Sequence, residues 1–220
     1  MKIQIYTMQT PEEAQAVAAL GVNHIGITPS NLGLPGEVDL ATARSIVEAV
    51  GDSAVSVALS VESDLEAIEA MVRAVQPDIL HLCGLEGTLS AETVGSLRAR
   101  LPNLPIMQAV SVAGPEAVET ALAYQEVADY LILDTQAPDI AGIGASGQPH
   151  DWNISREIVR HVRVPVILAG GLSPENVAEA IRAVRPWGVD SLTHTNRSLP
   201  NGGFCKDLDR IRQFVIAARR

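Results

Sequence analysis

Short apolar runs alternate with longer amphipathic segments along the whole chain. Four times, a Ser, Thr or Gly followed by Pro, Asp or Glu opens a segment with apolar residues at helical spacing, and a short apolar run follows it. Such an opening predicts a capped amphipathic helix, and the apolar run predicts a buried strand. The four helix–strand units open at Thr10, Ser63, Gly114 and Ser173, and their strands are predicted at residues 24–27, 78–82, 130–134 and 189–192.

The rest of the chain continues this alternation. Further strands are predicted at residues 2–6, 55–59, 106–110 and 165–169, and further helices begin near Asp39, Ser90 and Trp152, with a last one over 208–218. Eight strands alternating with eight helices predict an α/β fold, a (β/α)8 TIM barrel. A doubly wound open sheet is the alternative, but strand count and length favour the barrel. No linker or charge block divides the chain, so residues 1–220 are expected to form a single barrel domain.

The composition and net charge of the chain indicate which kinds of binding partner are excluded. Hydrophobic residues make up 47% of the chain, which is ample for a core, and the formal net charge is -10. That charge argues against nucleic acid or an anionic membrane as a partner. Cys83 and Cys205 give no disulfide framework, and no apolar run resembles a signal core or a membrane span, so a cytoplasmic protein is expected.

The segment 164–176 combines a predicted strand, a pair of glycines and a helix start. Gly170 and Gly171 permit backbone angles that other residues resist, and Ser173 is expected to cap the next helix with Pro174 in its first turn. A helix N-terminus that follows a glycine turn can bind an anion, most often phosphate. The alternative is a tight, well-capped turn without a ligand.

Polar residues gather where the predicted strands end, and that end of a barrel carries its chemistry. Burying so many polar groups costs free energy unless they meet one another or a ligand. The pattern predicts a polar pocket, with a satisfied structural network as the alternative. The residues concerned are Gln4, Tyr6, His81, Cys83, Gln108, Asp134 and His194, of which Gln4 and Gln108 are expected to contact the substrate.

Asp134 ends an apolar strand, where apolar surroundings would raise its pKa and suit it to general acid or base work. The alternative is a carboxylate that accepts hydrogen bonds from loop amides. His81 and Cys83 share one strand face and are candidates for a base, a nucleophile or metal ligands, although Cys83 also suits a buried apolar position. His194 is a further candidate. These four have acceptable ligand types for a metal, but without a spacing motif no metal is predicted.

Three further features are ambiguous. Residues 142–147 match G-x-G-x-x-G but do not open a helix after a strand, so Gly144, Ser146 and Gly147 suggest an anion-binding loop, or a surface loop, instead of a dinucleotide site. Arg197 and Lys206 flank a turn-rich segment, and each is either a mobile cation over the barrel mouth or a solvated surface charge. His24 and His161 lie toward the opposite end of their strands and are expected to be structural or exposed.

Several of these segments resemble the phosphoribosylanthranilate isomerase family over nearly the full chain. The resemblance rests on residues 164–190, 131–134 and 144–152 and on Lys206-Asp207. It implies a (β/α)8 enzyme without a cofactor that performs an Amadori rearrangement of a small phosphorylated sugar derivative. Asp134 would be the general acid that opens the ribose ring. The phosphate would be held by the glycine turn and by the segment after the last strand, at Gly170, Gly171, Thr193, Thr195 and Asn196.

The chain also departs from the family pattern. The family begins K-[IF]-C-G, with the cysteine as general base, whereas this chain has Gln4 in Lys2-Ile3-Gln4-Ile5. The S-P-R-Y loop, whose arginine meets the anthranilate carboxylate, aligns with residues 30–35, which contain no arginine. The Q-L-H-G and S-S-G-V-E segments are replaced at residues 81–84 and 192–196. A lost base costs about 10²–10⁴-fold in rate.

Three functions are therefore open. The first is an aldose–ketose isomerase of the family whose base has moved to Cys83, His81 or His194. The second is a lyase or epimerase on the same scaffold, with a metal on His81 and His194; a Schiff-base aldolase is disfavoured because Lys2 is the one lysine near a strand end. The third is a non-catalytic phosphate-binding relic. The fold alone does not distinguish these three functions, because this scaffold hosts many reactions. Either a monomer or a homodimer is expected.

Overall fold

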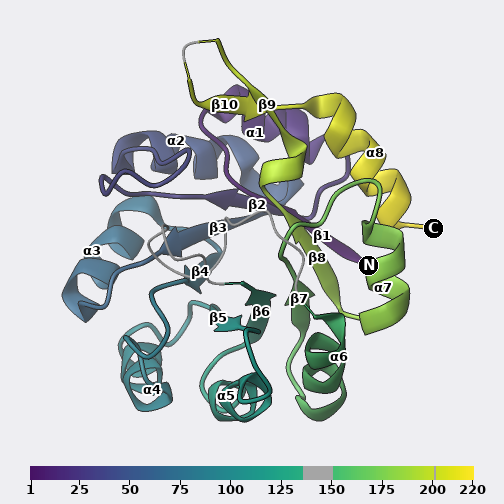
Figure 1. The fold of residues 1–220 in the computed structure, drawn as a ribbon. Coiled ribbons are helices and arrows are strands. Elements are labelled where there is room, and N and C mark those ends of the chain that lie inside the picture. The colour runs from purple at the N-terminus through teal and green to yellow at the C-terminus, as the bar shows by residue number, and fades with distance from the viewer. Residues whose placement is uncertain (136–150, 201) are drawn as a thin grey trace.

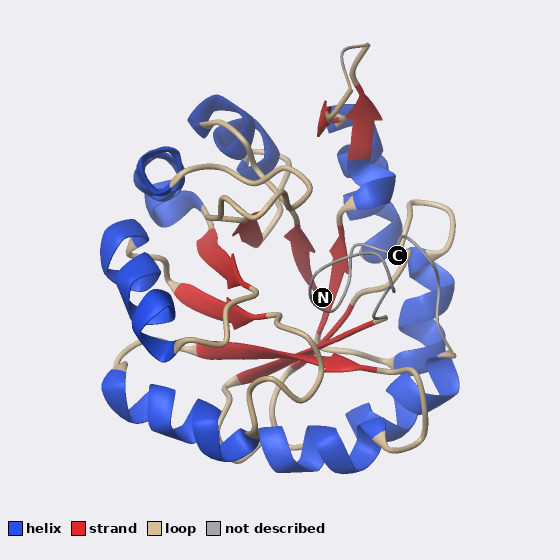
Figure 2. Cartoon of the chain, turned by 60° about the vertical axis from the view of Figure 1, so that its left-hand side comes forward, coloured by secondary structure: helices blue, strands red, loops and turns tan. Residues whose placement is uncertain are grey.

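The computed structural model describes residues 1–135, 151–200 and 202–220. Eight parallel strands follow one another around a closed barrel, and the last pairs with the first, which confirms the predicted (β/α)8 fold (Figures 1 and 2). The open-sheet alternative is wrong, since the barrel has no edge strand. The strands are β1 (Lys2–Ile5), β2 (His24–Ile27), β3 (Val55–Ser60), β4 (Ile79–Leu82), β5 (Ile106–Ser111), β6 (Tyr130–Asp134), β7 (Val166–Leu168) and β8 (Gly188–Ser191).

Helices surround the barrel (Figure 2). They are α1 (Pro11–Ala18), α2 (Leu40–Val50), α3 (Leu65–Val75), α4 (Ala91–Arg100), α5 (Ala117–Tyr124), α6 (Trp152–His161), α7 (Val177–Val184) and α8 (Leu208–Ala218). Most begin where a polar side chain accepts a hydrogen bond from a free amide of the first turn. These N-cap residues are Thr10, Asp39, Asp64, Ser90, Asp151 and Asp207. None of the described helices is long and apolar enough to span a membrane.

The core has two layers, because successive strand side chains point to opposite faces. One cluster contains residues such as Ile3, Ile5 and Leu80 together with apolar residues of the helices. The other contains strand residues and no helix residue among its buried members, so it fills the barrel interior. The interior members from the strands or their ends are Tyr6, Val57, Ile79, Cys83, Met107, Ala109, Ile132, Ile167 and Ala169. This division shows which polar strand residues face inward.

Two elements differ from the sequence prediction. Helix α7 begins at Val177, because the segment after Ser173 first forms a turn in which Asn176 Oδ1 accepts from the Ser173 amide at 2.8 Å. Ser173 Oγ accepts from the Glu175 amide at 3.2 Å within that turn. After β8, a short helical turn (Thr193–Thr195) leads into an antiparallel hairpin, β9 (Asn196–Ser198) and β10 (Phe204–Lys206), which the sequence pattern did not predict.

Candidate active site

Two aspartates lie at neighbouring positions of the carboxyl end of the barrel. Asp134 is the last residue of β6 and Asp190 lies in β8, and both line one small cavity beyond β7. Strand alternation places both side chains on the interior face, since Ile132 belongs to the interior cluster and Val189 to the outer one. Asp190 is buried, while Asp134 keeps partial exposure that a substrate can reach. The cavity is therefore acidic and close to the strand ends.

The two carboxyl groups resist ionisation. Burial raises the pKa of Asp134 to about 7, although the Thr135 amide donates to its Oδ1 at 2.7 Å. Burial also raises the pKa of Asp190 to about 8, and the charge of Asp134 adds to this effect, whereas Gln4 and Lys206 oppose it. Two carboxylates that share a site cannot both ionise easily. Near neutral pH the pair therefore retains a proton, as an acid and a base acting together require.

Sequence reasoning missed Asp190. It lies inside the apolar run 189–192, which was treated only as a buried strand. The alternation of that run would have revealed it, because Val189 faces the helices and the next residue must then face the interior. Asp190 Oδ1 is buried and has no hydrogen-bond partner among the described residues, which leaves it available to a ligand.

The predicted anion-binding turn borders the same cavity. Gly170 has a φ of 80° and Gly171 a φ of 64°, so both adopt the left-handed conformation that favours glycine. Thr193 and His194 line the cavity from the helical turn after β8. The side chain of Thr195 instead donates to the Leu192 carbonyl at 3.0 Å. The structure thus brings the glycine pair, Thr193 and His194 together with the two aspartates.

Lys206 and Asn196 are hydrogen-bonded to each other and do not line this cavity. Lys206 is 5% exposed, and its ammonium donates to the Tyr6 carbonyl and to Asn196 Oδ1. Burial lowers the pKa of Lys206 to about 7, against the opposing charges of Glu13, Asp190 and Cys205. Both expectations for Lys206 are wrong, because a buried, hydrogen-bonded ammonium is neither a mobile cation nor a solvated charge. Arg197 is exposed.

Tyr6, His81 and Cys83 lie in the barrel interior. Tyr6 Oη and His81 Nδ1 are 2.9 Å apart, and Cys83 belongs to the same interior cluster as Tyr6. Burial lowers the pKa of His81 to about 3, so its imidazole is neutral at ordinary pH and a weak proton acceptor. Burial, followed by the charges of Asp190 and Cys83, raises the pKa of Tyr6 well above its ordinary value. These values weaken the interpretation of His81 as the relocated base.

Gln4 lies one layer deeper than Tyr6. It pairs in register with Asp190 on one side and with His24 on the other. Its Oε1 is 3.1 Å from His24 Nδ1, and its Nε2 donates to Met107 Sδ at 3.9 Å. Gln4 is thus part of a buried polar layer beside Asp190, whereas Tyr6 occupies the carboxyl end of β1.

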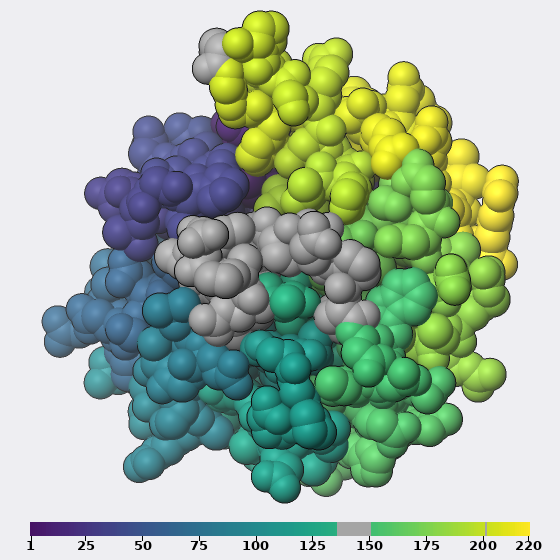
Figure 3. All heavy atoms as spheres, viewed as in Figure 1, coloured from purple at the N-terminus to yellow at the C-terminus, as the bar shows by residue number. Residues whose placement is uncertain are grey.

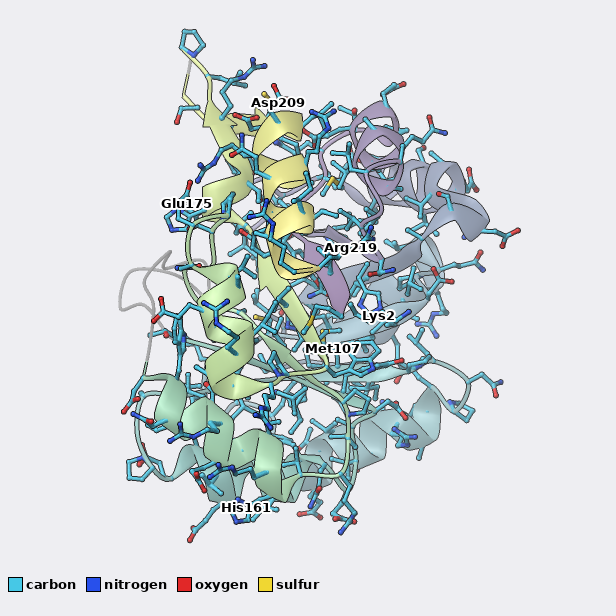
Figure 4. The ribbon with its side chains drawn as sticks, turned by 90° about the vertical axis from the view of Figure 1, so that its right-hand side faces the viewer. Lys2, Met107, His161, Glu175, Asp209 and Arg219 are labelled. Carbon is cyan, nitrogen blue, oxygen red and sulfur yellow. The ribbon has the colours of Figure 1, made fainter. Side chains whose placement is uncertain are left out.

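Two further histidines of the described residues, His24 and His161, lie away from the site. His24 is buried at the amino end of β2, beside the rings of Tyr130 and Trp187. Burial, assisted by Lys2, lowers the pKa of His24 to about 4. His161 is exposed on α6 (Figure 4).

Gln108 does not face the interior. Its neighbours Met107 and Ala109 belong to the interior cluster, so alternation turns Gln108 toward the helices. There it lines a separate cavity of about 240 Å³ with residues of the loop after β4 and of α5. Its Nε2 donates to the Ala109 carbonyl at 2.9 Å. The expectation that Gln108 shares the pocket of Asp134 is therefore wrong, because a strand position was counted as a strand end without regard to its face.

The loops after β2 and β3 border a further hollow of about 380 Å³ at the same end of the barrel. Leu32, Leu34 and Met71 give it an apolar lining, and Asp39 and Glu62 are its charged residues. The carboxylate of Glu37 accepts hydrogen bonds from the amides of residues 32–34 at 2.9–3.0 Å, which occupies those donors.

One predicted loop and one set of possible metal ligands have no counterpart in the described structure. Gly144, Ser146 and Gly147 lie outside the described residues. Within the described part of the chain, no group of three or more His, Cys, Asp or Glu side chains is arranged to hold a metal ion, so His81, Cys83, His194 and Asp134 do not form such a group.

The fold and the site together define a (β/α)8-barrel enzyme with a paired-carboxylate pocket beside a glycine turn. The sequence model of one family, N-(5'-phosphoribosyl)anthranilate (PRA) isomerase, matches residues 3–217. The chain belongs to the PRA isomerase family, and it is an isomerase of the intramolecular oxidoreductase class.

Relatives match over nearly their whole length. The N-(5'-phosphoribosyl)anthranilate isomerase of Methanocella arvoryzae is 34% identical over 218 residues, which cover 99% of this chain and 98% of that protein. The enzyme of the same name from Rhodopseudomonas palustris is 34% identical, with coverage of 99% and 95%. The crystal structure of phosphoribosyl anthranilate isomerase from Thermotoga maritima has a TM-score of 0.81 and 26% identity, and covers 100% of this chain and 98% of that one. A related structure holds reduced 1-(o-carboxyphenylamino)-1-deoxyribulose 5-phosphate, with a TM-score of 0.80 and 25% identity, over 100% of this chain and 98% of that one.

Proposed function

We propose that this enzyme converts an aminoaldose phosphate into an aminoketose phosphate by an Amadori rearrangement. The observation that carries the proposal is the pair of aspartates in one cavity, whose raised pKa values leave a shared proton near neutral pH. The names of its relatives make phosphoribosylanthranilate the first substrate to test.

The acid role suits Asp134. It keeps partial exposure at the end of β6, and its protonated form would give its proton to the ring oxygen of the sugar. The C1–O bond then breaks and leaves a protonated imine between C1 and nitrogen. This step needs a carboxyl group that is still protonated near neutral pH, which burial provides at Asp134.

The base role suits Asp190 better than His81. Removal of the proton on C2 gives an enaminol, and protonation at C1 followed by loss of the enol proton gives the ketone. When the proton held by the pair resides on Asp134, the Asp190 carboxylate is ionised and has an oxygen without a partner among the described residues, whereas His81, with a pKa of about 3, is a weak proton acceptor. Asp190 would thus supply the base that the departure at Gln4 leaves missing.

The phosphate would lie between the turn at Gly170 and Gly171 and the amides of Thr193 and His194. All four residues border the cavity of the two aspartates. Barrel enzymes often bind phosphate in the loops after the seventh and eighth strands. The phosphate group of the substrate and its reacting carbons would therefore be held by adjacent elements. Backbone amides would donate the hydrogen bonds to the phosphate, so the site can bind an anion although the net charge of the chain is negative.

We also propose a cytoplasmic location and a monomeric or homodimeric state for this enzyme. Neither Cys83 nor Cys205 forms a disulfide in the described structure, which suits the reducing cytoplasm. A monomer or a homodimer fits the family, since one related structure is described as monomers generated from a dimeric enzyme.

The test is an assay of purified protein with phosphoribosylanthranilate, followed by the loss of substrate fluorescence. We expect turnover that falls by about 10²–10⁴-fold in Asp134→Asn and in Asp190→Asn, because each change removes one member of the acid–base pair. Full activity in either variant would contradict the assigned roles. Absence of turnover in the wild type, with aminosugar phosphates of other N-substituents also inert, would overturn the proposed reaction.

A further inference from the structure

Tyr6 and His81 form a hydrogen-bonded pair across the barrel interior. Tyr6 follows β1 and His81 lies in β4, yet Tyr6 Oη is 2.9 Å from His81 Nδ1. Tyr6 is 4% exposed and His81 is 3% exposed. The Tyr6 ring lies against Gly26 of β2, where an added Cβ would come within 2.3 Å of the ring. The position of the phenol is therefore fixed by packing.

The pair can share its proton in two ways. Either the Tyr6 hydroxyl donates to Nδ1, which puts the imidazole hydrogen on Nε2, or Nδ1–H donates to the phenol oxygen. A phenol is a better donor than acceptor when it meets a neutral imidazole nitrogen. The second arrangement would also require another acceptor for the Tyr6 hydrogen, and no such acceptor is found among the described hydrogen bonds. The first arrangement is favoured.

His81 Nε2 is buried and has no hydrogen-bond partner among the described residues. A buried donor without a partner costs free energy, so such a group is retained where it has a use. The imidazole faces the barrel interior with Cys83, two residues nearer the carboxyl end, on the same strand face. A substrate that enters from that end would approach this N–H.

We propose that Tyr6 holds His81 in its Nε2–H tautomer, so that a neutral imidazole donates a hydrogen bond to the sugar oxygen at C2. This assignment of the accepting oxygen rests on the proposed reaction. The C2 oxygen becomes an enol and then a carbonyl during the rearrangement, so a fixed donor there is most valuable as that oxygen gains negative charge. The low pKa of His81 and the high pKa of Tyr6 support the proposal, because both groups stay neutral.

Nitrogen-15 NMR of histidine-labelled protein tests the tautomer without any substrate. We expect a pyridine-type Nδ1 and a pyrrole-type Nε2 for His81, assigned with His81→Gln. His24 is the internal contrast, since its Nδ1 faces Gln4 Oε1 at 3.1 Å and must carry the hydrogen. In Tyr6→Phe the His81 signals should shift toward a mixture of tautomers. A pyrrole-type Nδ1 at His81 in the wild type would overturn the proposal even if the enzyme proves active.

Kinetics test the role of the donor. His81→Ala removes the N–H and should lower kcat by about 10²–10³-fold with a much smaller change in KM. His81→Gln keeps an N–H donor and should recover most of that loss. His161→Gln, the same change at an exposed histidine, is the matched control and should leave the rate unaltered. Equal losses in His81→Ala and His81→Gln, at equal melting temperature, would show that His81 acts through packing alone. If no substrate turns over, the proposed reaction fails while the NMR result still decides the tautomer.

Discussion

At the scale of single residues, Tyr6, His81 and Asp190 of the barrel and Lys206 of the β9–β10 hairpin have little contact with solvent. For each of them, burial is the largest cause of the pKa shift, and it moves the equilibrium toward the uncharged form. Charges of neighbours modify this effect but do not reverse it. The interior near neutral pH is therefore polar but weakly charged, and hydrogen bonds to a bound substrate are stronger there than in water.

A pH dependence of stability follows from Asp190. Its pKa is about 8 in the folded protein and near 3.8 when unfolded, so the folded state holds its proton more tightly. The stability that this group contributes is fully present below a pH of about 4 and is lost as the pH rises to about 8. Asp190→Asn mimics the protonated form. The variant should gain stability relative to the wild type over that interval in urea denaturation, and a difference that is independent of pH would contradict the shift.

Some residues of the site can be predicted from the sequence, and others cannot. Asp134 was found because a carboxylate that ends an apolar strand is conspicuous. Asp190 was missed inside such a run, and Gln108 was assigned to the wrong face, although alternation contained both answers. The burial of Lys206 could not be predicted from the sequence, because it depends on a contact with the Tyr6 carbonyl, 200 residues away along the chain.

At the scale of elements, the β9–β10 hairpin is attached to the loop and helix that follow β1. The Lys206 amide donates to Glu13 Oε1 at 2.7 Å, and Gln9 Nε2 donates to the Phe204 carbonyl at 2.7 Å. Glu13 Oε2 also accepts from the Gln9 amide at 2.9 Å. In the space-filling view the yellow-green residues of this region lie beside the purple ones of the N-terminal segment (Figure 3). One carboxylate therefore joins the first loop to the hairpin.

Removal of that carboxylate should loosen the hairpin. Glu13→Ala leaves two partly buried amides without an acceptor, and we expect a loss of about 1–3 kcal/mol in the free energy of unfolding. Glu12→Ala, an exposed acidic residue in the same helical turn, is the control and should cost only a few tenths of a kcal/mol. Urea denaturation measures both. Similar losses for the two variants would show that the helix N-terminus, not the hairpin contact, needs the charge.

The contact between β2 and the Tyr6 ring gives a second prediction. Gly26→Ala places a methyl group within 2.3 Å of that ring, so the ring must move or the strand must shift. We expect a loss of about 1–3 kcal/mol in the free energy of unfolding. The nitrogen-15 NMR signals of His81 should also shift toward a mixture of tautomers, as in the Tyr6→Phe variant. Gly95→Ala in α4 is the control, because a helix favours alanine over glycine and its nearest contact is 3.3 Å away. An undisturbed His81 in Gly26→Ala would contradict the packing argument.

Elements were largely predictable because each depends on local pattern. Helix starts followed from cap residues such as Asp39 and Ser90, which accept the expected hydrogen bonds. The start of α7 was placed too early, since Asn176 folds back on Ser173 and inserts a turn that Pro174 permits. The hairpin escaped prediction because its strands have three residues each and owe their order to contacts with Glu13 and Gln9.

At the scale of the whole molecule, the mouth of the barrel has two unlike sides. The cavity with Asp134, Asp190 and the glycine turn borders β6, β7 and β8, whereas the apolar hollow borders β2 and β3. Strand order in the closed barrel places these two groups across from each other. A substrate whose phosphate lies beside the glycine turn would extend its N-substituent toward the apolar side.

This arrangement predicts weak recognition of a negatively charged N-substituent. The lining of the hollow contains Asp39 and Glu62 but no Lys, Arg or His among the described residues, and Glu37 already occupies the amides of residues 32–34. The kcat/KM for a phosphoribosyl aniline should at least equal that for phosphoribosylanthranilate. In Leu32→Arg, about 1 kcal/mol of attraction should shift the ratio toward the anthranilate. A strong preference of the wild type for the anthranilate would contradict this prediction.

Closure of the barrel joins the two ends of the strand order, because Lys2 pairs with Gly188 and Gln4 with Asp190. These contacts have very high sequence separation, and such contacts form slowly during folding because a long loop must close first. Tyr6 lies on one side of this seam and Asp190 on the other. A nascent chain can form its early helix–strand units one after another during synthesis, but its catalytic pocket does not exist until the last strand meets the first.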